Sequence, residues 1–126
     1  MKAKMILCVD DEPTVLTTRK LVLQSVGYRV LTATNGYDGL SMFCEHPVEA
    51  VVLDYAMPGM DGGELASEIK RRNPDMPILM LSAYMYLPDA ALQDVDIYLT
   101  KTEGPVAMIN ALKSLLNEQG MCKGAA

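Results

Sequence analysis

Short apolar segments alternate with amphipathic ones along this chain. Apolar runs predict strands at residues 4–9, 48–54 and 77–83, and looser patterns predict two more at 28–33 and 96–101. The run VEAVVLD at 48–54 is β-branched and does not alternate, which is typical of a strand buried on both faces of a parallel sheet.

The segments between these strands carry helical patterns and helix boundary signals. Pro13 suits the first turn of a helix, Gly27 is a stop signal, and Pro47 and Pro74 each end a later segment. The segment after Pro13 has an approximate apolar stripe, formed by Val15, Leu16, Leu21, Val22, Leu23 and Val26. We expect helices over 14–26, over 37–45, around Leu65 and Ile69, over a short stretch at 88–93, and over 106–116.

Strands that alternate with helical segments in this way indicate an α/β fold. The expected architecture is a doubly wound (βα)5 domain, in which right-handed crossovers place helices on both faces of a parallel sheet. The chain has 126 residues, of which 50% are hydrophobic, so it is long enough for one domain with a core and too short for two. We expect residues 1–126 to form a single domain, with the core at about 4–119 and a short C-terminal tail.

Charge and cysteine usage argue against several classes of function. The net charge is −5 and the longest basic run is Lys70–Arg72, which we interpret as the last turn of a helix, so we expect no direct binding to nucleic acid. Neither a membrane span nor a signal peptide is predicted. The three cysteines, Cys8, Cys44 and Cys122, lack CxxC spacing, which favours reduced thiols and a cytoplasmic location over disulfides or zinc.

Polar residues occupy the carboxyl ends of four of the five predicted strands. Asp10 and Asp11 follow the first strand, Asp54 ends the third, Ser82 lies near the end of the fourth, and Lys101 ends the fifth. In the flavodoxin-like strand order 2-1-3-4-5 these four strands are contiguous, and ligands bind at that edge of the sheet. We therefore expect these side chains to converge on one pocket.

The acidic residues of this pocket need a counterion. Two carboxylates about 4 Å apart repel each other by roughly 4 kcal/mol at an effective dielectric constant of about 20. A divalent cation removes this repulsion, and a few carboxylates with water ligands favour Mg²⁺ over zinc or caged Ca²⁺. Taken singly, Asp11 or Glu12 before Pro13 is typical of a helix cap, as is Asp61 before Gly62.

Four motifs resemble those of the receiver domain of two-component response regulators, and the resemblance covers essentially the whole chain. VDDE is similar to the acidic pair of that family, and VVLDYAMPGMDG to its phosphoacceptor strand and loop. PILMLSA is similar to the strand that carries the switch hydroxyl, and IYLTK to the segment with the switch aromatic residue and the lysine.

The resemblance implies that Asp54 accepts a phosphoryl group from a histidine kinase or a histidine phosphotransfer protein. It implies that Asp10, Asp11 and Asp54 hold Mg²⁺, with the backbone carbonyl of Ala56 as a further ligand. Lys101 would neutralise developing charge. Such a protein is a signalling switch that assists its own phosphorylation and dephosphorylation, and not a turnover enzyme.

The resemblance also implies a switch and a tuned phosphoryl lifetime. Ser82 would donate its hydroxyl to the phosphoryl group, and Tyr98 would then move into the space that the loop vacates. Ala56 and Tyr84 occupy the positions expected to tune the lifetime, Ala56 by offering no help to an attacking water and Tyr84 by shielding the site.

Two segments depart from the family pattern. Thr102 follows Lys101 where receivers usually have a proline joined by a cis bond, and a cis bond before a non-proline costs roughly 3 to 4 kcal/mol. We therefore predict a trans peptide between Lys101 and Thr102 and a rearranged loop toward Pro105. The segment YLPDAALQDV is short, which predicts a stunted fourth helix and argues against conventional dimerisation.

These features leave three hypotheses open. The first is a phosphoacceptor that signals to a downstream partner or to an output domain on a longer parent chain. The second is a degenerate receiver that acts as a phosphorylation-independent interaction module. The third is a phosphohydrolase acting through Asp54, which is disfavoured because no second acid lies two residues after it.

Overall fold

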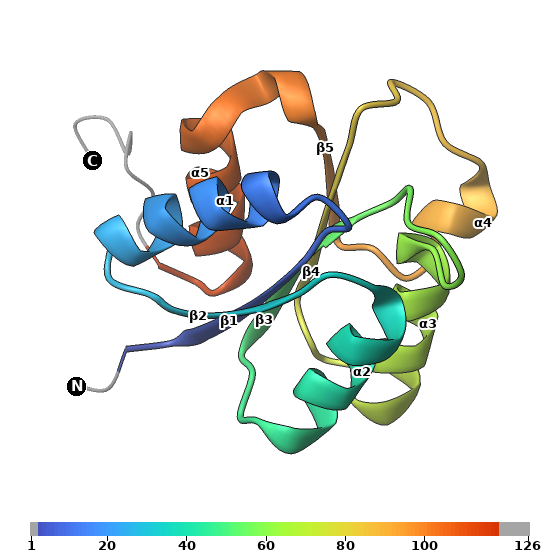
Figure 1. The fold of residues 1–126 in the computed structure, drawn as a ribbon, viewed down its shortest axis with the longest axis horizontal. Helices are drawn as coiled ribbons and strands as arrows, with labels where there is room; N and C mark the ends of the chain where they lie inside the picture. The colour runs from blue at the N-terminus through green and yellow to red at the C-terminus, as the bar shows by residue number, and fades with distance from the viewer. Residues whose placement is uncertain (1–2, 119–126) are drawn as a thin grey trace.

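The computed structural model describes residues 3–118, which build a five-stranded parallel sheet with the order β2-β1-β3-β4-β5 (Figure 1). This order confirms the doubly wound arrangement predicted from the alternation of segments. The strands are β1 (Met5–Val9), β2 (Arg29–Ala33), β3 (Ala50–Asp54), β4 (Ile78–Ser82) and β5 (Ile97–Thr100).

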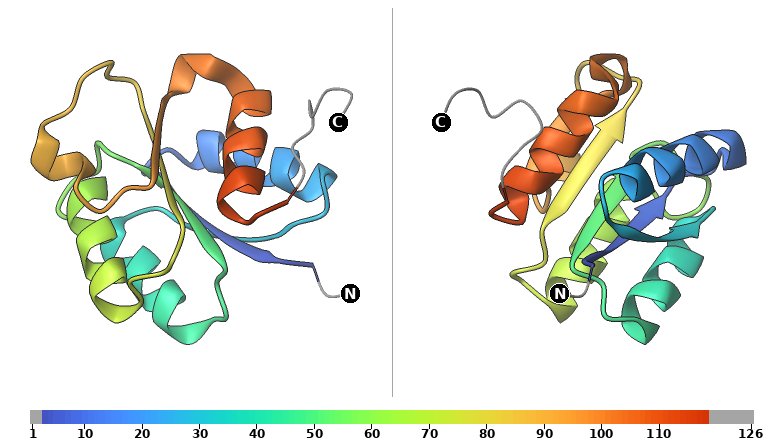
Figure 2. Two further views of the ribbon diagram at one scale, coloured as in Figure 1. Left: turned by 180° about the vertical axis from the view of Figure 1, so that it is seen from behind. Right: turned by 90° about the vertical axis from the view of Figure 1, so that its left-hand side faces the viewer.

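Helices cover both faces of the sheet. They are α1 (Pro13–Ser25), α2 (Gly36–Glu45), α3 (Gly62–Arg72), α4 (Asp89–Leu92) and α5 (Gly104–Leu115), with a 3-10 turn, η1 (Lys101–Glu103), before α5. Figure 2 shows α1 and α5 on one side of the sheet and α2 and α3 on the other. The predicted shortness of the fourth helix is confirmed, because α4 has only 4 residues. No helix within residues 3–118 has the length and apolar character needed to cross a membrane.

The central strands are buried on both faces, as their unalternated sequences predict. Ile6 and Cys8 of β1 pack against α1 and α5, whereas Leu7 and Val9 of the same strand pack on the α3 side. All five residues of β3 and all five of β4 are buried. The sheet is therefore a rigid platform whose carboxyl edge presents the loops that follow β1, β3 and β4.

The acidic residues before α3 and before α1 differ in whether they cap the helix. Asp61 caps α3 in a capping box with Glu64, in which each side chain accepts from the other residue's backbone N–H, and this confirms the predicted cap. Helix α1 instead begins at Pro13, and Glu12 makes no side-chain capping bond. The acids before α1 are thus not used as helix caps.

Three local features differ from the sequence-based expectation or refine it. Strand β5 ends at Thr100, so Lys101 lies in η1 and not in the strand. The peptide between Lys101 and Thr102 is trans, as predicted. Leu21, which the pattern placed on the apolar stripe of the first helix, is 62% exposed because it lies on the solvent side of α1.

Glu118, the last residue of the described chain, contacts the residues that directly precede β1 and β2. The Tyr28 hydroxyl donates to Glu118 Oε1 at 2.6 Å, and Lys4 Nζ lies 3.0 Å from Oε2. Partial burial raises the pKa of Glu118, but these two interactions outweigh it and hold the pKa below the usual 4.5. The ionised form of Glu118 therefore stabilises the folded protein.

Replacing Glu118 by Gln should lower the free energy of unfolding by about 1 kcal/mol at pH 7. Because the pKa is depressed in the folded state, this contribution is present above pH 4.5 and is lost as the pH falls through the folded pKa. Urea unfolding at pH 7 and at pH 3 measures the difference, which should shrink at the lower pH. Glu45→Gln, at an exposed position, is the control and should change stability by less than about 0.5 kcal/mol. A constant difference across this range would contradict the expectation.

Candidate functional site

Buried polar side chains gather at the carboxyl edge of the sheet. Among the described residues, four polar or charged side chains are buried: Asp10, Arg19, Asp54 and Ser82. Asp54 is the last residue of β3, Ser82 the last of β4, and Asp10 directly follows β1. The neighbouring strands therefore bring together the three residues that the sequence singled out from separate segments.

Lys101 contacts the carboxylates of two of these residues, Asp10 after β1 and Asp54 at the end of β3. Its Nζ lies 3.0 Å from Asp10 Oδ2 and 3.1 Å from Asp54 Oδ1. Burial lowers the pKa of Lys101, but its hydrogen bonds to Asp10 and Asp54 outweigh this effect and raise the pKa above 10.5. The ammonium is therefore charged at neutral pH. It bridges the carboxylates of Asp10 and Asp54.

Asp54 has a raised pKa. Burial is the largest cause, and the neighbouring charge of Asp10 adds to it, whereas the hydrogen bond from Lys101 works in the opposite direction. The ionised form of Asp54 is thus less stable here than in water. A cation near this carboxylate, or loss of its charge, would relieve the penalty.

Three carboxylates cluster where β1 turns into α1. One oxygen each from Asp10, Asp11 and Glu12 lies within 4.8 Å of the others, with Asp10 buried and the other two exposed. Asp54 is joined to this cluster through Lys101. Glu12 was not among the predicted ligands, although its place beside the acidic pair was a visible signal.

The donor chemistry of this cluster fits Mg²⁺, which prefers hard carboxylate oxygens and retains water ligands. Asp10 is already engaged, because its Oδ1 accepts from the Glu12 backbone N–H at 3.0 Å and its Oδ2 contacts Lys101. The exposed Asp11 and Glu12 are open to an incoming ion. Ala56 lies in the exposed loop after β3, and its carbonyl as a further ligand stays a prediction.

The predicted switch residues meet at the backbone of Tyr84. Ser82 Oγ accepts a hydrogen bond from the Tyr84 N–H at 3.0 Å. The Tyr98 hydroxyl, from half-buried Tyr98 in β5, donates to the Tyr84 carbonyl oxygen. The Tyr84 side chain itself is 55% exposed, and its shielding role stays a prediction.

Arg19 is a component of the site that the sequence pattern did not reveal. Its Nη1 lies 3.5 Å from Asp10 Oδ2, the oxygen that Lys101 also contacts. Arg19 falls three residues after Leu16 and four before Leu23, the other two buried residues of α1. A charge at helical spacing within an apolar stripe was the signal that could have identified it.

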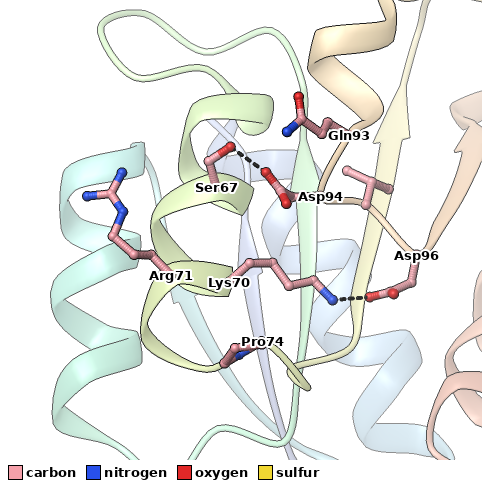
Figure 3. A pocket seen from close by; sticks show the side chains of 8 residues that line it. Ser67, Lys70, Arg71, Pro74, Gln93, Asp94 and Asp96 are labelled. Atoms are coloured by element: carbon pink, nitrogen blue, oxygen red, sulfur yellow. Dashed lines mark hydrogen bonds and ion pairs between the residues drawn. The ribbon is translucent and has the colours of Figure 1, made fainter.

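Lys70 and Arg71 of the basic run line a separate polar pocket, between α3 and the segment that leads into β5 (Figure 3). Lys70 Nζ lies 2.8 Å from Asp96 Oδ2, and the Ser67 hydroxyl donates to Asp94 Oδ2 at 2.6 Å. Arg71 and Arg72 pair with Glu68 on their own helix. These contacts agree with the interpretation of the run as the last turn of a helix.

The fold and the site define a class of protein. The family model of the response regulator receiver domain matches residues 6–121, so the chain belongs to this family. The chain is 37% identical over 120 residues to the transcriptional regulatory protein GlrR of Escherichia coli K12, covering 93% of this chain and 27% of GlrR. It is 36% identical over 108 residues to the sensor histidine kinase GacS of Pseudomonas protegens, covering 79% of this chain and 12% of that kinase.

Solved structures agree with this assignment. The response regulator TrrA of Thermotoga maritima, in complex with Mg²⁺ and BeF, has a TM-score of 0.85 and 37% identity, covering 89% of this chain and 98% of that one. The same regulator in complex with the histidine kinase ThkA has a TM-score of 0.83 and 38% identity, covering 90% of this chain and 98% of that one.

Proposed function

We propose that this chain is the phosphoacceptor of a two-component phosphorelay, in which Asp54 takes a phosphoryl group from a phosphohistidine donor. The observation that carries the proposal is the position of Lys101 Nζ, 3.0 Å from Asp10 and 3.1 Å from Asp54. This geometry places an ammonium beside the accepting carboxylate and couples it to the acidic cluster.

Asp54 supplies the nucleophile of the transfer. One carboxylate oxygen attacks phosphorus, an acyl phosphate bond forms, and the bond from phosphorus to the donor imidazole nitrogen breaks with its electron pair on the imidazole. Lys101 stabilises the negative charge on the phosphoryl oxygens. The carboxylates that would hold Mg²⁺ are those of Asp10, Asp11 and Asp54, with Glu12 beside them, and the ion when bound neutralises phosphoryl charge.

The domain assists this reaction without catalysing turnover of a separate substrate. Its side chains position the phosphoryl group and balance its charge, while the energy comes from the donor. Hydrolysis of the acyl phosphate then resets the switch, and Ala56 and Tyr84 are proposed to set its rate. Alanine adds no group that could orient the attacking water.

Ser82 and Tyr98 would transmit the change. The Ser82 hydroxyl can donate to a phosphoryl oxygen, which favours a loop position closer to Asp54. Tyr98 would follow the loop because its hydroxyl binds the Tyr84 backbone. Phosphorylation then shifts an equilibrium between two loop positions. The size of the shift depends on the contacts that the phosphoryl group makes in one position and not in the other.

The proposed upstream partner is a histidine kinase or a histidine phosphotransfer protein in the cytoplasm. The solved complex of TrrA with its kinase supports this assignment. Downstream, the phosphorylated face would bind another protein or an output domain on a longer chain. The match to GlrR, a transcriptional regulatory protein, spans only 27% of that longer chain, which is consistent with an output domain on a longer parent chain.

Incubation with acetyl phosphate and Mg²⁺, followed by intact mass measurement, tests the proposal. A labile adduct of one phosphoryl group is expected, and EDTA should abolish it. No adduct from acetyl phosphate or from a phosphorylated histidine kinase would overturn the proposal in favour of an interaction module. Thr102 in place of the usual proline, within the 3-10 turn Lys101–Glu103, and the 4 residues of α4 are the features that favour this second function. Steady release of phosphate from many phosphate esters would instead indicate a hydrolase.

A further inference from the structure

Arg19 is a buried cation that contacts Asp10 of the acidic cluster. Its side chain is 7% exposed, and its closest carboxylate, Asp10, is fully buried. Helix α1 places Arg19 on the face that carries Leu16 and Leu23, which packs on the sheet. The guanidinium is therefore largely shielded from solvent on the core side of α1.

Asp10 is the carboxylate partner of this guanidinium. Within residues 3–118, Arg19 forms no other ion pair, and its contact with Asp10 Oδ2 spans 3.5 Å. The same side chain also lines a cavity of about 390 Å³ between α1 and α5. Because a buried guanidinium is strongly unfavourable without a counterion, the contact with Asp10 fixes where its charge lies.

Two permanent cations therefore share one oxygen of the acidic cluster. Asp10 Oδ2 is contacted by Lys101 at 3.0 Å and by Arg19 at 3.5 Å. Its other oxygen accepts from the Glu12 backbone N–H. Asp10 is thus neutralised and oriented before any metal arrives, which leaves the exposed Asp11 and Glu12 as the charge available to an ion.

We propose that Arg19 is a positioning residue that acts as a built-in counterion: it holds Asp10 in place in the metal-free protein and weakens the binding of a divalent cation. The inference rests on the proposed function, because it concerns the same metal site. A full positive charge that contacts a buried carboxylate of the cluster opposes the binding of a cation to the same cluster. Arg19 thereby sets the Mg²⁺ concentration at which the site fills.

Neutral substitutions at Arg19 test the proposal by calorimetric titration with MgCl₂. Arg19→Met, which keeps length and apolar packing, and Arg19→Gln, which can still donate to Asp10, should each bind Mg²⁺ at least tenfold more tightly. A tenfold change corresponds to about 1.4 kcal/mol. The rise in melting temperature on adding Mg²⁺ should be larger in both variants than in the unmodified protein.

Two matched variants separate local charge from general effects. Arg19→Lys keeps the charge and should bind Mg²⁺ within about threefold of the unmodified protein. Lys20→Met removes the neighbouring positive charge of α1, which makes no ion pair with the described residues, and should also stay within about threefold. Tighter binding by Lys20→Met equal to that of Arg19→Met would overturn the proposal.

The remaining outcomes are decisive as well. Folded Arg19→Met and Arg19→Gln with unchanged or weaker Mg²⁺ binding would overturn the inference. If these variants unfold without metal and regain near-ultraviolet circular dichroism on adding Mg²⁺, the metal replaces Arg19 and the inference is supported. If they stay unfolded in saturating Mg²⁺, Arg19 is purely structural and the inference is overturned. An unmodified protein that binds no Mg²⁺, or whose binding survives Asp11→Asn, would instead remove the proposed metal site itself.

Discussion

An Asp54→Asn variant should take up no phosphoryl group from acetyl phosphate or from a phosphorylated histidine kinase. The amide is nearly the same size as the carboxylate and can still accept a hydrogen bond from Lys101, so the site should keep its shape. Its neutral oxygen is a far weaker nucleophile and cannot form a stable acyl phosphate. Intact mass after incubation with Mg²⁺ and acetyl phosphate should show only the unmodified chain.

This variant should also remain well folded. The pKa of Asp54 is raised, mainly by burial, which means that its ionised form destabilises the folded state at neutral pH. Removing the charge therefore offsets the loss of the ion pair with Lys101. We expect a melting temperature without metal no lower than that of the unmodified protein.

Asp61→Asn is the matched control, because Asp61 lies on the loop that follows Asp54 and differs from it in role. It caps α3, and asparagine is as good a cap as aspartate. This variant should be phosphorylated normally. An adduct of equal yield in Asp54→Asn, or its loss in Asp61→Asn alone, would show that the acceptor is another residue.

Lys101→Met should slow phosphorylation by acetyl phosphate about 10²-fold to 10³-fold, the usual cost of removing one group that stabilises transition-state charge. Lys101 Nζ is the cation that contacts both Asp10 and Asp54. Methionine fills much of the same volume but leaves the two carboxylates without this shared partner. The rate of adduct formation at saturating Mg²⁺ measures the loss.

Lys70→Met provides the comparison for this variant. Lys70 also forms an ion pair, with Asp96 at 2.8 Å, but in the polar pocket beside α3 and away from the carboxyl edge. Its removal should leave the rate within about twofold, since surface ion pairs contribute little. A rate for Lys101→Met within threefold of the unmodified protein would show that the metal alone supplies the needed charge.

The sheet could be predicted because its strands are short apolar runs and its helices carry clear boundary signals. The stretch at 48–54 shows the physical reason, since a strand buried on both faces has no polar position to alternate with. Strand ends were less certain. Lys101 falls outside β5 because Thr100 and Glu103 form a capping box that begins η1, a local hydrogen-bond pattern that hydrophobicity does not encode.

The site was predictable in part because parallel strands end at the same edge of the sheet. That rule brought Asp10, Asp54 and Ser82 together from separate segments. The same rule could not reveal Arg19, because Arg19 lies in the middle of α1 and not at the end of a strand. Helical spacing places Arg19, and not Lys20, on the buried face of α1, but its contact with Asp10 follows from how α1 packs on the sheet.

The backbone of Tyr84 connects the end of one strand to the middle of the next. Its N–H is held by Ser82 Oγ and its carbonyl oxygen by the Tyr98 hydroxyl. Under the proposed switch, a displacement of Ser82 would reach the Tyr98 ring through the two peptide units that flank the Tyr84 α-carbon. Such a route would need neither a long helix nor a rotating subunit, because it runs through the backbone of one residue.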